Sequence, residues 1–87
     1  MSKNHIASIA ILVKDRKTNS KEVNRILTEN GHLILARLGV NLQRHCIENC
    51  AAMITITVEG SPDEIKNITK QLDKLYGIVA KTNIMTE

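Results

Sequence analysis

The residues best suited to chemistry are His45, Cys46 and Cys50, which lie close together in one segment of the chain. Thiolate and imidazole groups are ligands that suit zinc, copper or iron. A closed zinc site normally needs four protein ligands, and no second cysteine pair completes the set. We therefore interpret the segment first as an ordinary loop without a cofactor. The alternative is a transition-metal or redox-responsive site, which a second copy of the chain could complete.

A second candidate site is Asp15-Arg16, which directly follows an apolar run. A turn that leads from a strand into a helix presents the free N–H groups of the helix start, and these favour an anion. The turn at residues 15–19 (DRKTN) contains no glycine that would let a ligand approach the backbone closely. The turn is thus either a plain polar connection or the site of a small-molecule effector.

Basic residues recur four positions apart at Lys66, Lys70 and Lys74, and again at Lys21 and Arg25. This spacing places each set on one face of a helix. The net charge is only +3, and the chain has one Tyr, no Phe and no Trp. RNA-recognition modules of similar topology stack bases on aromatic side chains, so direct nucleic-acid binding is not expected. We interpret the lysines as a solvated helix face.

The sequence shows no Ser–His–Asp set, no paired buried carboxylates and no glycine-rich phosphate loop. The first predicted strand–helix turn also lacks the Cys-x-x-Cys pair of copper chaperones. We therefore expect no enzymatic activity.

Alternating apolar residues predict four strands, at residues 5–14, 32–38, 51–59 and 78–84. Asn19 followed by Glu22 resembles a capping box, which predicts a helix from there to Asn30-Gly31. The second helix should start at Ser61-Pro62-Asp63-Glu64, because Ser is a good cap and Pro fits the first helical position. Residues 39 to about 50 are expected to form a loop, or a loop with a short hairpin extension.

The order of these elements predicts an α+β protein with a βαββαβ sandwich over residues 1–87, a single domain. A weak repeat supports two strand–helix–strand halves, because Ile9, Ile11 and Val13 match Ile54, Ile56 and Val58 at an offset of 45. Right-handed crossovers place the first and third strands in the middle of a four-stranded antiparallel sheet with both helices on one face.

One face of that sheet is left without helices. Its expected residues include Ala10, Leu12, Met53 and Thr55, with Thr57. An apolar face of this kind is unusual on a monomer, and a small domain gains stability from further burial. We therefore expect the chain to associate with itself, as a dimer or tetramer, through this face.

Residues 6–13 are apolar, but they are too few to span a membrane, and no secretory signal is recognised. We expect a cytoplasmic protein without membrane contact, in which both cysteines are free thiols.

Five segments, in order, carry a family resemblance: VKDR (13–16), VNRIL (23–27), LARLG (35–39), SPDEI (61–65) and LYGIVAKT (75–82). Together they resemble the ACT-like family of iron-only hydrogenase system regulators. The resemblance implies a ferredoxin-like fold, an oligomer and a regulatory role, in transcription or in the hydrogenase system. The chain departs from the family at Val40-Asn41, where a proline is common, and in the loop at residues 40–50. We accordingly expect a non-catalytic regulatory or sensor module.

Overall fold

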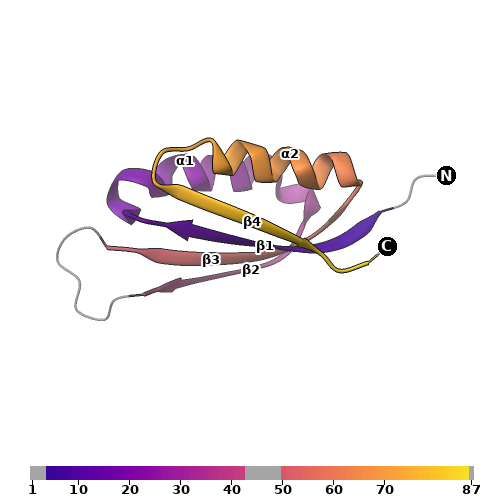
Figure 1. Ribbon diagram of the computed structural model, residues 1–87, viewed down its shortest axis with the longest axis horizontal. Coiled ribbons are helices and arrows are strands. Elements are labelled where there is room, and N and C mark those ends of the chain that lie inside the picture. The colour runs from indigo at the N-terminus through magenta and orange to yellow at the C-terminus, as the bar shows by residue number, and fades with distance from the viewer. Residues whose placement is uncertain (1–3, 43–49, 87) are drawn as a thin grey trace.

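The computed structural model describes residues 4–42 and 50–86. Two helices lie on one side of a four-stranded sheet (Figure 1). The elements follow the order β1, α1, a 3₁₀ turn, β2, β3, α2 and β4, with bounds β1 His5–Val13, α1 Arg16–Glu29, 3₁₀ turn Gly31–Leu33, β2 Ile34–Asn41, β3 Ala52–Gly60, α2 Pro62–Asp73 and β4 Ile78–Ile84.

The strands lie in the order β2-β3-β1-β4 and every neighbouring pair is antiparallel. The central strands are therefore β1 and β3, and the edges are β2 and β4. The βαββαβ sandwich expected from the sequence is confirmed. This arrangement leaves one sheet face, here called the open face, with no helix over it (Figure 1).

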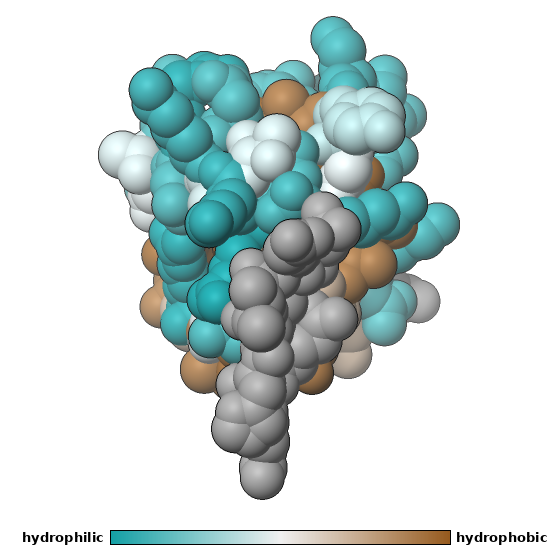
Figure 2. All heavy atoms as spheres, turned by 90° about the vertical axis from the view of Figure 1, so that its left-hand side faces the viewer, coloured by the Kyte–Doolittle hydropathy of each residue, from teal (hydrophilic) through white to brown (hydrophobic). Residues whose placement is uncertain are grey.

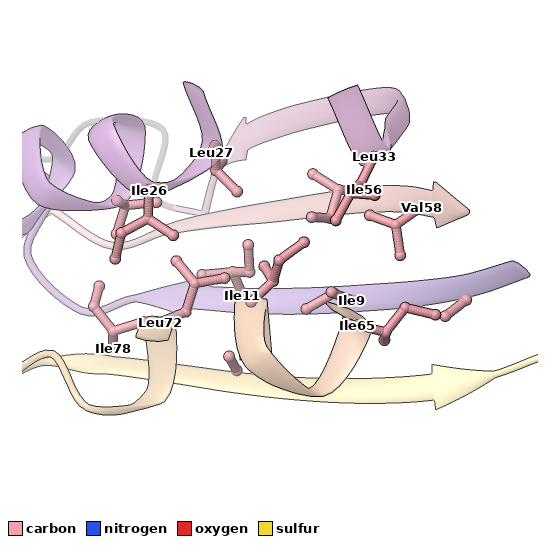
Figure 3. Close-up of a cluster of buried hydrophobic side chains, with 14 of the residues drawn as sticks. Ile9, Ile11, Ile26, Leu27, Leu33, Ile56, Val58, Ile65, Leu72 and Ile78 are labelled. Atoms are coloured by element: carbon pink, nitrogen blue, oxygen red, sulfur yellow. The ribbon is translucent and has the colours of Figure 1, made fainter. Parts of the chain in front are cut away.

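The core lies between the helices and the other sheet face (Figure 3). Burial alternates along β1: Ile9 and Ile11 are fully buried, whereas Ala10 and Leu12, which directly follow them, are only partly buried. Neighbouring side chains of a strand point to opposite faces, so the alternation assigns Ile9 and Ile11 to the helix side. The buried core of the described residues is entirely aliphatic, and the single aromatic residue, Tyr76, is 93% exposed.

The predicted start of α1 is wrong by several residues. The helix is capped by Asp15, whose carboxylate accepts hydrogen bonds from the Lys17 N–H and the Thr18 hydroxyl. Asn19, expected as the cap, is a residue of α1 itself, and its side-chain amide donates a hydrogen bond to the Tyr76 carbonyl at 2.7 Å. Asp and Asn are equally good N-cap residues. Glu22, three residues after Asn19, completed an apparent capping box and so favoured Asn19 over Asp15 in the prediction.

The boundary between α1 and β2 also differs from the prediction. Asn30 ends the helix and its side-chain amide donates to the Ile26 carbonyl, while Gly31 does not take the left-handed conformation. A 3₁₀ turn delays β2, which then runs through Gly39 to Asn41 instead of ending at residue 38. Gly39 is tolerated in the strand because its helix-side position faces Ile54 across the ladder.

The predicted start of α2 is confirmed. The Glu64 N–H donates to the Ser61 hydroxyl, the Ser61 N–H donates to the Glu64 carboxylate, and Pro62 stands at the first helical position. Ile65, Ile68 and Leu72 form the buried stripe of this helix.

The connection from α2 to β4 depends on Gly77, which has φ +77°. A Cβ at this position would lie 2.8 Å from the Asn19 side-chain oxygen. We expect Gly77→Ala to lower the free energy of unfolding by more than about 1 kcal/mol, because alanine is strained at positive φ. Urea denaturation measures the change. Gly31→Ala is the matched control, since an added Cβ there meets open space, and equal stability of the two variants would contradict the assignment.

The capping box of Ser61 and Glu64 makes the free energy of unfolding depend on pH. The backbone N–H of Ser61, followed by its side chain, lowers the pKa of Glu64 from its ordinary value of 4.5. A carboxylate with a depressed folded pKa stabilises the fold above its unfolded pKa, and this contribution is lost as the pH falls through the folded value. We expect the stability difference between the wild type and Glu64→Gln to be largest above about pH 5 and to shrink at lower pH. Thermal unfolding across that range checks this, and a difference that is independent of pH would contradict it.

Candidate functional site

The predicted metal segment can be placed only in part, because His45 and Cys46 lie outside the described residues. Cys50 precedes β3, its carbonyl accepts a hydrogen bond from the Arg16 N–H at 2.9 Å, and its sulfur is disulfide-bonded. The expectation of a free thiol at Cys50 is therefore wrong for this structure. A disulfide sulfur is not a thiolate ligand, so metal binding by this segment stays a prediction for the reduced chain. Within residues 4–42 and 50–86, no cluster of three His, Cys, Asp or Glu side chains could hold a metal ion.

The predicted ligand pair Asp15-Arg16 is brought to the start of α1, and both side chains have structural contacts. Asp15 caps the helix, as described above. The Arg16 guanidinium donates to the Asn41 side-chain oxygen at 2.8 Å and so ties α1 to the end of β2. Effector binding at this turn stays a prediction, and the structure explains the two residues without it.

The basic residues of the helices remain on the surface. Arg25 forms ion pairs with Glu22 and Glu29 at 2.8 and 3.1 Å, and its hydrogen bonds to Glu22 and then Glu29 raise the pKa of its guanidinium. Lys66, Lys70 and Lys74 are exposed along α2, as a solvated face predicts. The ion pairs of Arg25 neutralise part of the basic surface.

The open face is more apolar at one end than the sequence indicated. Directly opposed residues of an antiparallel pair share a face and lie in contact. The register aligns Val40 with Met53, Met53 with Leu12, and Leu12 with Val79, so one apolar row crosses all four strands. The next row runs Leu38, Thr55, Ala10 and Lys81.

We define the open-face patch as the apolar members of these two rows: Ala10, Leu12, Leu38, Val40, Met53 and Val79. Three of the four predicted interface residues belong to the patch, and the fourth, Thr55, lies between its members. Leu38 and Val40, 67% and 48% exposed, were missed. For Val40 the missed signal is the alternation that continues past Gly39, since a glycine in a strand was read as a strand end. Leu38 lay inside the predicted strand, but its face was not assigned.

The apolar exposure also extends along the β2 edge. Leu35 and Leu42 are each more than half exposed, and Leu35 lies at an irregularity in the pairing of β2 with β3. The side chains over the helices are largely hydrophilic by contrast, whereas hydrophobic ones gather lower, toward the sheet (Figure 2). The exposed leucines and valine of β2 and its end therefore lie on the sheet side of the molecule.

A family model described as "TM1266-like: Iron-only hydrogenase system regulator, putative" matches residues 5–82. This match covers every helix and nearly every strand of the fold. The chain belongs to the TM1266-like family. The family resemblance drawn from the five sequence segments is confirmed. No curated protein sequence matches this TM1266-like chain.

Solved structures show how widely the fold recurs. The uncharacterized protein TM1266 from Thermotoga maritima superposes with a TM-score of 0.82 at 24% identity and covers 97% of this TM1266-like chain and 100% of its own. An unknown protein from Galdieria sulphuraria gives 0.71 at 10% identity, covering 95% of this chain and 50% of its own. CPII from Thiomonas intermedia K12, bound to ADP, AMP and acetate, gives 0.56 at 11% identity over 98% and 91%. These likenesses show the fold alone.

No helix of the described TM1266-like chain is long and apolar enough to cross a membrane.

The structural role of Asp15 can be separated from a ligand role by substitution. We expect Asp15→Ala to lower the free energy of unfolding by about 1 kcal/mol, the usual value of an N-cap, and Asp15→Asn to retain most of it. Urea denaturation of both variants gives the comparison. If Asp15→Ala were as stable as the wild type, the cap would not explain this residue and a ligand role would gain support.

Proposed function

We propose that this chain is a non-catalytic regulatory module of the iron-only hydrogenase system that acts as a homo-oligomer, with the open-face patch buried between copies. The patch is the single observation on which the proposal rests. Membership of the TM1266-like family supports the regulatory role.

The arrangement of the patch supports burial against a second copy. Its two rows place aliphatic side chains next to one another across four strands, and the one charged residue of these two rows is Lys81, at their β4 edge. Two sheets can pack about 10 Å apart when their facing side chains interdigitate. Each Å² of apolar surface removed from water contributes roughly 25 cal/mol. A self-complementary patch of this kind satisfies the requirement of a twofold interface.

The size of the domain supports the same conclusion. Small domains bury a limited share of their surface. A core without aromatic rings also lacks the large buried area that each Phe, Tyr or Trp side chain supplies. A second aliphatic layer on the open face would give β1 and β3 cover on both sides. The apolar residues on both faces of β1 are explained by such cover, as they are in strands that lie at the centre of a layered fold.

The chemistry of the described residues supports a role without catalysis. Acid–base catalysts are usually found as cavity-lining groups with strongly shifted pKa values. The two described groups with clear shifts, Arg25 and Glu64, lie on helix surfaces, and ion pairing and capping account for them. No charged or polar side chain among the described residues is buried.

The test is the mass of the protein in solution after a charge is placed in the patch. We expect the wild type to be a dimer or larger at micromolar concentration, and Leu38→Glu to be a monomer, because a carboxylate buried between apolar faces is costly. Light scattering coupled to size exclusion measures both. Tyr76→Glu is the matched control, since Tyr76 is 93% exposed and lies in the turn before β4. A monomeric wild type, or an oligomer unaffected by Leu38→Glu, would overturn the proposal.

A further inference from the structure

The outer edge of β4 carries a feature that the open-face patch does not use. In a strand, the N–H and C=O of one residue point to the same side and alternate from residue to residue. The Ala80 N–H does not bond β1 but donates to the Asp73 carboxylate at 3.1 Å, and the Ile78 N–H donates to the Leu75 carbonyl. The regular β1–β4 register then directs the backbone groups of Thr82 and Ile84 outward too.

This edge is thus protected along only half of its length. The first half is closed by Asp73 at the end of α2 and by Leu75 in the turn that follows it. At Thr82 and Ile84 the outward N–H and C=O groups have no partner among the described residues. Natural edges are usually blocked or covered, and an unblocked stretch is a template on which another strand can pair.

An apolar groove of about 300 Å³ lies beside the same unblocked stretch. Thr82 and Ile84 are paired with the buried residues Ile9 and Ala7, so their side chains lie on the helix side of the sheet. The groove lies between these two side chains and α2. The hydroxyls of Thr69 and Thr82 are hydrogen-bonded to each other. It is lined by Pro62, Ile65, Lys66, Thr69, Thr82 and Ile84.

If another strand paired with the outer edge of β4, every second one of its side chains would lie on the groove side. Side chains of a strand beside β4 alternate between the helix side and the open face. A helix-side aliphatic side chain would enter the groove, where Ile65 and Ile84 supply apolar contacts. Backbone pairing combined with pockets for alternate side chains is the general mode of strand addition.

Positive charge stands on both sides of the edge. Lys66 lines the groove on the helix side, and Lys81, opposite Ala10 in the register, lies on the open face. An acidic side chain opposite Lys81 would be favoured as a cross-strand pair of opposite charge. A second copy presenting the same β4 would bring lysines instead, so the charges favour a different partner.

We infer that the unblocked half of the β4 edge, with its groove, binds an extended segment of a partner protein in which aliphatic and acidic residues alternate. The aliphatic residues enter the groove and the acidic ones face Lys81. This surface is separate from the open-face patch, and the inference does not require the chain to be an oligomer.

The probe is a heptapeptide, Thr-Glu-Ile-Glu-Val-Glu-Thr-amide, that carries fluorescein on its N-terminal amine and whose affinity is measured by fluorescence anisotropy. A peptide with lysine in place of each glutamate is the charge control. We expect the acidic peptide to bind at least about tenfold more tightly than the basic one, and Ile84→Glu to weaken it by about tenfold or more. Tyr76→Glu is the matched chain control and should bind as the wild type does. The backbone amide resonances of Thr82 and Ile84 should shift on binding.

Several outcomes would overturn the inference. They are no binding at about 1 mM peptide, equal affinity for both peptides, no effect of Ile84→Glu, or amide shifts confined to β2. An oligomer that dissociates in Ile84→Glu would show that β4 pairs with a second copy instead. The same titration on Leu38→Glu separates this surface from the proposed assembly: binding should persist there whether or not the wild type is an oligomer.

Discussion

The rest of the structure depends on one constraint: both faces of the sheet are apolar, but the two helices cover only one of them. Ile9 and Ile11 bury their side chains under the helices, while Ala10 and Leu12 on the same strand point to the open face. Amphipathic helices can cover one face of this topology only, because both crossovers have the same hand. The second face must be covered by another molecule or remain in water. The proposed assembly is the first of these solutions.

The two edges of the sheet are treated differently, which fits two different uses. Edge β2 carries large exposed leucines and no proline or lysine, and its apolar side chains continue the open-face patch. Edge β4 is blocked at its start by Asp73 and left unblocked at Thr82 and Ile84, beside a groove. Long strand edges with unpaired backbone groups tend to pair with other chains, and each of these two edges carries only one charged residue, Arg37 on β2 and Lys81 on β4. The proposed assembly and the inferred strand addition use different residues of the sheet, so neither excludes the other.

The sequence was informative wherever a pattern depended on local physics. Ser61, Pro62 and Glu64 predicted the start of α2 because capping involves only neighbouring residues. The alternation in β1 and β3 predicted which side chains enter the core, because one residue of slip would reverse every face. The family resemblance added what no local pattern shows, namely the regulatory context.

The failures arose where tertiary contacts decide. Asn19 and Asp15 are comparable caps, and the choice depends on the Tyr76 carbonyl, which lies 57 residues away and takes the Asn19 side chain. Gly39 was expected to end a strand, but its ladder with β3 continues it to Asn41. The extent of the patch followed from that error, since Val40 lies beyond Gly39. The blocked and unblocked halves of β4 could not be predicted, because they depend on how the end of α2 meets the strand.

The most direct test of the central claim compares two side chains that are equally exposed in a single chain. Val40, in the open-face patch, is 48% exposed, and Ile84, on β4, is 49% exposed. A soluble paramagnetic agent broadens methyl resonances in proportion to their contact with solvent. If the open face is buried between copies, the Val40 methyls of the wild-type protein will be protected while the Ile84 methyls are strongly broadened. Equal broadening of the two at high protein concentration would contradict the account.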